Sequence, residues 1–299
     1  MDEFKTEEGV VQVPGASLRY RLVGQETTLP VIVFENGWSA SYHYWIWVER
    51  ELAPHARLLF YNRAGIGGST LEAPKSARSL SDQFEAMLAA LGIETPIVVV
   101  GQSYGGLMCA LHAAQKPRCV VGYVQLDATP SRESPFAMKM VSTMKLVTRI
   151  TTFMSRLGLP DPVYRAIARA LPPAEAELLR KTALHSPVSM RNAFLELDQI
   201  GEFQAAIAQA KSMPPRLVIS ASRLPEQSGF LARILPSRKK SQAIVHFMQE
   251  AHRAQAAPNG QWESAPFTHG GLVFEAAGAR HSAARVLDFA RSLRLPERA

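Results

Sequence analysis

This 299-residue sequence has little cysteine and no long apolar run, and we expect no export leader from its first residues. Its two cysteines, Cys109 and Cys119, are too few for the disulfide framework of small secreted domains. The first ten residues, MDEFKTEEGV, are acidic and polar, unlike a secretory signal. Apolar runs stay below the ~18 residues that a membrane-spanning helix needs. We therefore expect a cytoplasmic protein with reduced thiols, a single Cys109–Cys119 bridge being the open alternative.

The charge balance excludes some classes of protein and favours none strongly. Hydrophobic residues make up 47% of the chain and charged residues 20%, as in a folded globular domain rather than a disordered one. The net charge of +7 suits an anionic partner. Nucleic-acid binding also needs a reading motif, and helix-turn-helix, zinc-finger and RNP signatures are all missing.

His246 and His252 share a helical segment without a partner cysteine or paired carboxylate. We expect no nucleic acid, no metal and no cofactor.

Short strands alternating with helices dominate the rest of the pattern. Residues 10–24 alternate as an antiparallel hairpin whose turn lies near Pro14-Gly15. Later apolar runs are too short for free helices and lack alternation, which is typical of strands buried on both faces of a parallel sheet. This order predicts a doubly wound α/β fold. The expected strands are 31–34, 58–61, 97–100, 120–126, 217–220 and 272–274, and the expected helices are 45–52, 80–91 and 105–115.

The segment beginning at Ile97 carries the chemistry. The string IVVVGQSYGG runs from a buried strand into Gly101-Gln102-Ser103-Tyr104-Gly105, and a helix follows at once. This is a G-x-S-x-G motif in the strand–turn–helix setting of a nucleophile elbow. Side chains at either glycine would collide with neighbouring backbone in so tight a turn. The helix N-terminus below Ser103 directs N–H groups toward developing negative charge. Ser103 is therefore the predicted nucleophile.

A serine nucleophile needs a base within hydrogen-bonding reach. His281 follows the expected strand 272–274 and is the last of the eight histidines, so we predict it as the general base. His269 is the competitor, but it precedes that strand and so would lie at its wrong end. His112, on the helix after Ser103, is expected to be a packing residue.

The chain resembles the α/β-hydrolase superfamily, and in particular its lidded bacterial esterase-like and aminopeptidase-like branch. The resemblance implies backbone N–H groups of Trp38 and Tyr104 as the oxyanion hole. Asn36-Gly37 stands where the family usually has His-Gly, and the donors are unaffected because they belong to the backbone. Halide and epoxide chemistry in this superfamily uses an aspartate nucleophile, so Ser103 argues against both. The resembling stretches are VIVFENGWSASYHYW, YNRAGIGGST, VVVGQSYGG, VVGYVQLDATP and, more weakly, VFEAAGARHSA.

The third member of the triad has two candidates. The family commonly places its acid after the strand at 217–220, where this chain has Leu224, with Glu226 two residues later. A second solution in the superfamily is an acid after the preceding strand, and Asp127 stands there. Carboxyl ends of strands are where an open α/β sheet displays functional groups. We predict Asp127, with Glu226 as the alternative, to fix the imidazole tautomer.

The predicted organisation is a hydrolase core at 1–130 and 216–299 with a helical cap or lid at 131–215, inserted after the sixth strand. Residues 136–157 read as an amphipathic helix, and 136–170 hold six basic residues and one acid. We expect the apolar stripe of this helix to pack on the core. Contact of its basic face with anionic lipid is the less favoured alternative.

The predicted activity is hydrolysis of a small-to-medium apolar carboxylic ester through an acyl-enzyme, with that ester as the expected partner. An amidase, iminopeptidase or acyltransferase would use the same residues. A peptidase also needs a carboxylate-rich site for the substrate amine, which the cap glutamates do not obviously form. A ligand-sensing relative with little turnover is the alternative from another class, and a structural interaction protein would not need Ser103. The glutamates concerned are Glu175, Glu177, Glu196 and Glu202.

Overall fold

An eight-stranded sheet forms the centre of the protein in a computed structural model. The structure describes residues 5–93, 96–116, 118–131, 142, 145–146, 149, 153, 167–182, 187–224 and 237–293, without the side chains of 180–182 and 187–190. The strand order is β1-β2-β4-β3-β5-β6-β7-β8. The hairpin β1 (Thr6–Val13) and β2 (Ala16–Gly24) pairs antiparallel, as predicted, and β2 is antiparallel to β4. The strands from β4 to β8 are mutually parallel.

Five of the expected buried strands are confirmed, and the sixth is wrong. Residues 272–274 lie in a short helix, α11 (Gly271–Phe274), and the last strand is β8 (Gly260–Ala265). β8 has a partner on one side only, so its residues are mostly part-exposed and its sequence, GQWESA, is polar. A search for continuous apolar runs therefore passes over it. The confirmed strands are β3 (Val31–Glu35), β4 (Arg57–Tyr61), β5 (Ile97–Gln102), β6 (Val120–Leu126) and β7 (Arg216–Ala221).

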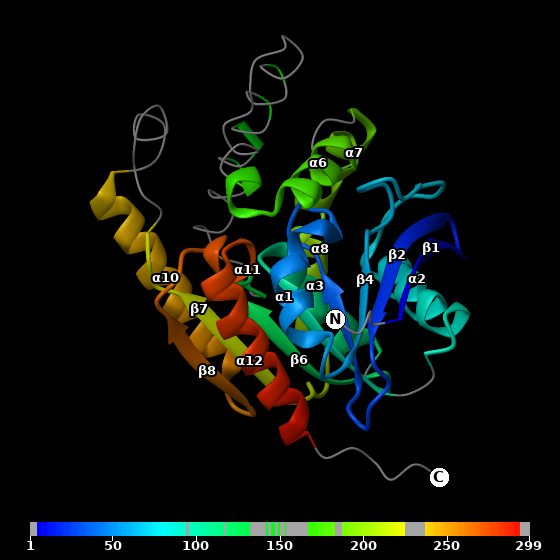
Figure 1. Cartoon of the computed structure of the whole chain (residues 1–299). Coiled ribbons are helices and arrows are strands. Elements are labelled where there is room, and N and C mark those ends of the chain that lie inside the picture. The colour runs from blue at the N-terminus through cyan, green and yellow to red at the C-terminus, as the bar shows by residue number, and fades with distance from the viewer. Residues whose placement is uncertain are drawn as a thin grey trace.

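Helices cover both faces of the sheet (Figure 1). One face packs on α1 (Ile46–Leu52), which follows the 3-10 turn η1 (Tyr42–Trp45), and on α12 (Ala276–Ser292). The opposite face packs on α2 (Ala77–Ala90) and α3 (Tyr104–Gln115). Because side chains of a strand alternate between the two faces, β3, β4, β5 and β6 contribute apolar residues to both layers. The core is thus two apolar layers with the sheet between them.

The described residues between β6 and β7 are mostly helical. It holds α6 (Pro173–Thr182), α7 (Pro187–Asp198) and α8 (Ile200–Ala208). α8 packs on α3, and Figure 1 shows α6 and α7 beyond one edge of the sheet. The division into a core and a 131–215 cap stays a prediction. Most of the amphipathic stretch 136–157 lies outside the described residues, but two of its basic side chains are described and contact α7: Lys145 pairs with Asp198, and the Arg149 guanidinium lies 5.9 Å from the ring centroid of Phe194.

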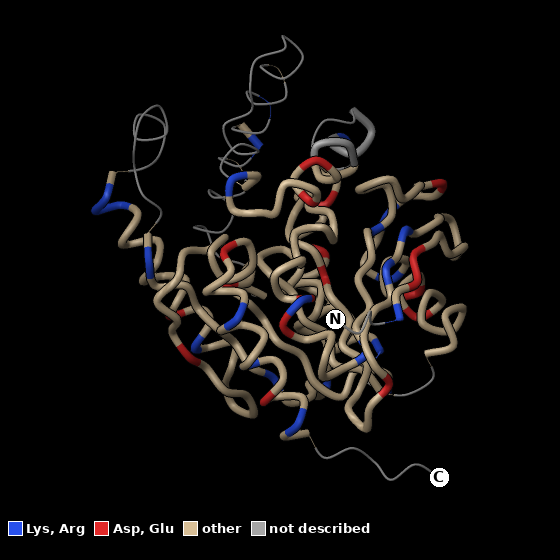
Figure 2. The backbone as a smooth tube through the Cα atoms, in the orientation of Figure 1, with Lys and Arg blue, Asp and Glu red and all other residues tan. Residues whose placement is uncertain are grey.

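Positions with Lys or Arg and positions with Asp or Glu are interspersed along the backbone (Figure 2). The densest basic group is the N-terminal end of α10 (Arg238–Ala256), where Arg238, Lys239 and Lys240 are exposed. α10 covers β7 and β8. In the part of the chain that the structure describes, no helix has the length and apolar character to cross a membrane.

Candidate active site

The topology brings the predicted site residues to one edge of the sheet. Parallel strands end at a common edge, so the turns that follow them lie close together. β3 leads into Asn36–Trp38, β5 into Ser103 and β6 into Asp127. β5 lies between β3 and β6 in the sheet. Ser103 therefore stands between the turn after β3 and the carboxylate after β6.

Ser103 occupies the strained turn that the G-x-S-x-G motif predicts. Its backbone has φ 57° and ψ −121°, a conformation that residues with a side chain rarely adopt. A Cβ atom on Gly101 would lie 2.3 Å from the backbone of Gly105, and one on Gly105 would lie 2.1 Å from the Glu35 carbonyl oxygen. The predicted collisions are confirmed. The backbone of Ser103 is held by Leu126 and Thr129 at 3.1 and 2.9 Å.

Asp127 contacts His269, not His281. Its Oδ2 accepts a hydrogen bond from His269 Nδ1 at 2.6 Å, and its Oδ1 accepts one from the Ala221 N–H at 3.0 Å. Asp127 is buried and has a φ of 46°, which Asp tolerates better than most residues. The backbone of β7 thus stabilises the carboxylate that follows β6. The segment after β8 carries the histidine back across these strand ends.

The hydrogen bonds of His269 define its tautomer. Nδ1 donates to Asp127, so Nε2 carries the lone pair and accepts from Gln102 Nε2 at 3.0 Å. Gln102 also donates to the backbone carbonyl of His269 at 3.2 Å. Because Gln102 directly precedes Ser103, the basic edge of the imidazole lies beside the elbow. This is the tautomer that a general base needs.

Asp127 is held in its charged form. Burial alone would raise the pKa of its carboxyl, but the hydrogen bond and charge of His269 outweigh burial and lower that pKa below its ordinary value. His252 and the Ala221 N–H lower the pKa further. The carboxylate is therefore ionised at neutral pH. An ionised Asp127 favours a positive charge on His269 when the imidazole takes up a proton.

Another histidine, His252 of α10, is fully buried and supports the turn that contains Asp127. His252 Nε2 donates to the Ala128 carbonyl at 2.7 Å, and its Nδ1 accepts from Ser220 Oγ at 2.8 Å. Trp262 Nε1 donates to the same hydroxyl at 2.8 Å. Burial lowers the pKa of His252, so it is a neutral imidazole that fixes backbone. Sequence spacing gave no sign of this role, because the four groups come from α10, the turn after β6, β7 and β8.

The turn after β3 contains Trp38, one of the two residues whose N–H groups are the expected oxyanion donors. Asn36 replaces the usual histidine and has a structural role: its Nδ2 donates to the Tyr61 carbonyl at 2.7 Å, and its Oδ1 accepts from Trp45 Nε1 at 2.9 Å. A Cβ on Gly37 would lie 2.8 Å from Gln102 Oε1, so this turn packs tightly on the end of β5. Tyr104 begins α3 and is fully buried. Trp38 and Tyr104 as oxyanion donors remain a prediction.

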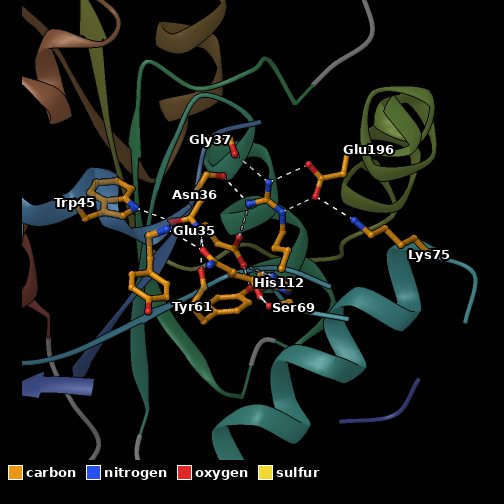
Figure 3. A network of polar contacts seen from close by, with 12 residues as sticks. Glu35, Asn36, Gly37, Trp45, Tyr61, Ser69, Lys75, His112 and Glu196 are labelled. Carbon is orange, nitrogen blue, oxygen red and sulfur yellow. Dashed lines mark hydrogen bonds and ion pairs between the residues drawn. The ribbon is translucent and has the colours of Figure 1, made fainter. Parts of the chain in front are cut away.

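A buried charge cluster lies below that turn (Figure 3). Arg63, which follows β4, lies between Glu35 at 3.2 Å and Glu196 of α7 at 2.8 Å. Glu196 also contacts Lys75 at 3.3 Å, and His112 Nε2 lies 2.9 Å from Glu35. Burial alone would raise the pKa of Glu196, but Arg63 and then Lys75 lower it. No spacing in the sequence links Arg63 to α7, so this cluster was not predicted.

The structure places His281 away from Asp127. It lies within α12, where its Nε2 is 3.4 Å from Glu263 Oε1 and its ring is 5.5 Å from that of Phe267. The prediction that His281 stands in a loop after the last strand is wrong, because residues 272–274 are helical. His281 is therefore set aside as the base. The alternative acid, Glu226, lies outside the described residues.

His269 was weighed and rejected on an incorrect strand assignment. Once β8 is placed at Gly260–Ala265, His269 follows the last strand by four residues. A loop position after the last strand is where the expected histidine belongs. The available signal was the alternation within GQWESA, followed by a turn-forming Phe-Thr-His-Gly-Gly segment.

With the elbow, the acid and the histidine in place, the class of protein follows. The family model described as alpha/beta hydrolase fold matches residues 30–196, which is more than half of the chain. The chain belongs to this family. It is a hydrolase of the α/β-hydrolase superfamily.

Similar curated proteins cover the chain to different extents. An AB hydrolase superfamily protein of Gibberella zeae is 24% identical over 226 residues, which is 73% of this chain and 68% of that protein. The sn-1-specific diacylglycerol lipase ABHD11 of Mus musculus is 30% identical over 156 residues, 52% of this chain and 48% of the lipase. The probable transporter efuK of Hormonema carpetanum is 34% identical over 111 residues, 36% of this chain. There the chain spans only 16% of the relative's length.

Solved structures share the fold over nearly the whole chain. A thermophilic esterase from Thermogutta terrifontis has a TM-score of 0.64 and 18% identity, covering 96% of this chain and all of the esterase chain. A candidate epoxide hydrolase from Pseudomonas aeruginosa has a TM-score of 0.69 and 16% identity, covering 97% of this chain and 99% of the other. At these identities the likeness concerns the fold alone.

Proposed function

We propose that the protein hydrolyses carboxylic esters through an acyl-enzyme formed on Ser103. The observation that carries the proposal is the 2.6 Å hydrogen bond between Asp127 and His269, with the Nε2 edge of His269 beside the elbow, where it accepts from Gln102. This replaces the expected pairing of Ser103 with His281. The esterase and lipase among the similar proteins favour ester chemistry.

The proposed mechanism begins when the Ser103 hydroxyl takes the place of the Gln102 amide at His269 Nε2. Ser103 Oγ attacks the ester carbonyl while its proton passes to Nε2. Asp127 stabilises the resulting imidazolium, and the N–H groups of Trp38 and Tyr104 stabilise the oxyanion. The imidazolium then protonates the leaving alcohol. Water attacks the acyl-enzyme in the same way and releases the acid.

Described contacts of the cap glutamates argue against the aminopeptidase alternative. Glu196 is fully buried between Arg63 and Lys75, and Glu202 Oε1 accepts from the Ala77 N–H at 2.7 Å. Glu175 lies 3.6 Å from Arg50. A peptidase needs its carboxylates available for the substrate amine, and these three already have partners. Ser103 also stands where members that cleave epoxides carry an aspartate, so ester chemistry is the better fit.

The decisive test combines covalent labelling with turnover. A fluorophosphonate probe, mapped by mass spectrometry, is expected to label Ser103 of the wild type. Ser103→Ala is expected to lose the label and to lower hydrolysis of p-nitrophenyl acyl esters by about 10⁴-fold or more. Equal turnover by both proteins across all chain lengths, with Ser103 unlabelled, would contradict the proposal.

The same assay separates the alternatives. Faster cleavage of p-nitroanilides than of esters with the same acyl group would indicate an amidase. Transfer of the acyl group to an added alcohol in preference to water would indicate an acyltransferase. Stabilisation by an ester without product release would indicate a ligand-sensing relative.

A further inference from the structure

Arg63 has all of its hydrogen-bond donors occupied. A guanidinium carries five N–H groups in a fixed plane. Nε and one Nη2 donor go to the two carboxylate oxygens of Glu196 at 2.8 and 3.1 Å. One Nη1 donor goes to Glu35 at 3.2 Å. The remaining two reach the backbone carbonyls of Asn36 at 2.6 Å and Gly37 at 3.0 Å. Arg63 is 2% exposed, so water does not compete for these donors.

The Gly37 carbonyl belongs to the same peptide unit as the Trp38 N–H. A trans peptide is planar, and its C=O and N–H point in opposite directions. Holding the Gly37 oxygen against Arg63 therefore aims the Trp38 N–H away from Arg63. A positive charge on the carbonyl side also polarises the peptide, which makes its N–H a stronger donor. Together with the Ala40 N–H, which donates to the same oxygen at 3.2 Å, Arg63 fixes the direction of one proposed oxyanion donor, and its charge strengthens that donor.

Arg63 and α7 also contact the residues that carry the two proposed donors. The Arg63 guanidinium lies 4.9 Å from the ring centroid of Tyr104. The Trp38 indole donates from Nε1 to the Ala193 carbonyl of α7 at 2.6 Å, and its ring lies 6.3 Å from Phe194. α7 therefore holds the turn after β3 twice, once through Trp38 and once through Glu196 and Arg63.

We propose that Glu196 is a positioning residue for the oxyanion hole: it orients Arg63, and Arg63 orients the Gly37–Trp38 peptide. This inference rests on the proposed function of Ser103. It makes the efficiency of the site depend on the seating of α7, a helix from the segment between β6 and β7. Figure 3 shows Glu196 and Lys75 on one side of the cluster and Asn36 and Gly37 on the other.

The geometry distinguishes this role from a simple ion pair. A planar fork can bind a carboxylate through two donors and still reach two carbonyls, whereas a lysine offers a point charge with three donors. Arg63→Lys keeps the charge and loses the fork. Glu196→Gln keeps the shape, but it places an NH₂ group against an Arg63 or Lys75 donor. With either change, the side chain at residue 63 is no longer held against the Gly37 carbonyl and can move away from it.

The test compares Glu196→Gln and Arg63→Lys with a matched control, Glu202→Gln. Glu202 lies in α8, and its carboxylate accepts from the Ala77 N–H at the start of α2, on a different turn from Gly37. The control therefore makes the same substitution at a neighbouring carboxylate that contacts another element. Active sites are first counted with the fluorophosphonate, so that all rates refer to labelled Ser103.

Three quantities are measured on each protein. These are kcat/KM for a p-nitrophenyl ester, the Ki of an alkyl boronic acid, and the Ki of the ether analogue of the substrate. The boronate adduct of Ser103 places an oxygen in the oxyanion position, and the ether does not react.

Loss of one oxyanion donor lowers the rate by about 100-fold or more, so a misaligned donor is expected to lower it roughly 10- to 100-fold. We expect kcat/KM and boronate affinity to fall together by that factor in Glu196→Gln and Arg63→Lys. The ether Ki is expected to stay within about threefold, and Glu202→Gln to match the wild type.

Each other outcome has a definite meaning. Folded, labelled Glu196→Gln with wild-type kcat/KM and boronate affinity would overturn the inference, as would an equal loss of ether affinity. Glu196→Asp, which keeps the charge and shortens the side chain, replaces Glu196→Gln if that variant does not fold, and the same loss is expected. A wild type whose Ser103 takes no label would contradict the proposed function itself, and this inference with it.

Discussion

The two sides of the candidate site differ in burial and in the number of contacts. On the acid–base side, the His269 side chain is 52% exposed and sits in a loop after an edge strand. On the oxyanion side, Arg63 is 2% exposed, Glu196 is fully buried, and each guanidinium donor has an acceptor.

The difference matches the work proposed for each side. A general base has to exchange hydrogen-bond partners during turnover, from Gln102 to Ser103 and then to the leaving group. An exposed imidazole with one strong anchor, Asp127, can do so. Oxyanion donors stabilise the transition state best when they are already aligned and do not reorganise. A buried and saturated Arg63 provides that rigidity.

The largest effect is expected on the exposed side. His269→Ala removes the proposed base and should lower kcat/KM for esters by about 10⁴-fold or more. His281→Ala is the matched control: His281 lies in α12 and packs on Glu263 of β8 and on Phe267, so this change should leave kcat/KM within about threefold. The measurement is ester hydrolysis per folded protein. A large loss in His281→Ala with an active His269→Ala would reverse the assignment and remove the basis of the comparison.

Asp127→Asn is expected to have the next largest effect. Asparagine can still accept from the Ala221 N–H, and it tolerates the positive φ of this position. It loses the negative charge and favours the wrong imidazole tautomer, which should cost about 10³- to 10⁴-fold in kcat. Fluorophosphonate labelling should slow in parallel. Hydrolysis within tenfold of the wild type would show that another group, such as Glu226, supplies the acid.

Local chemistry explains why much of this could be predicted from the sequence. The elbow is set by neighbours in the chain, because a strand, two glycines and a helix leave Ser103 a single conformation. Asp127 was found because a carboxylate directly after a buried strand must lie at the strand's carboxyl end. Five of the parallel strands were found because burial on both faces leaves continuous apolar runs.

The rest depends on contacts between distant segments. β8 is an edge strand with polar residues, so it lacks the apolar run of a central strand. Because the last strand was assigned to residues 272–274, the loop after it was misplaced, and His281 was predicted as the base in place of His269. The Arg63–Glu196 pair joins residues 133 positions apart, and its partners show no spacing that a single sequence reveals. Only the packing of α7 on the core brings them together.

The smallest effect expected to distinguish the acid–base side from the oxyanion side is in how the free energy of unfolding depends on pH. Asp127 and Glu196 both have a pKa lowered in the folded protein, despite burial. A carboxyl with a lowered folded pKa adds stability above its unfolded pKa, about 4, and that stability is lost as the pH falls through the folded value. Breaking a fully buried ion pair costs about 3 kcal/mol, and weakening the hydrogen bonds of Asp127 costs about 1–2 kcal/mol.

At pH 7, Glu196→Gln should therefore lose more free energy of unfolding, relative to the wild type, than Asp127→Asn does. For both variants, the difference from the wild type should become smaller as the pH is lowered toward 3. The measurement is the free energy of unfolding by urea at several pH values, with Glu202→Gln as the control for a Glu→Gln change. Below the unfolded pKa of these carboxyls, protonation of the unfolded wild-type chain begins to remove the stability that the two carboxylates add, so each variant moves closer to the wild type as the pH falls. Gaps that widen in acid would contradict the lowered pKa values. A larger gap for Asp127→Asn than for Glu196→Gln would place the rigid side of the site at His269 rather than at Arg63.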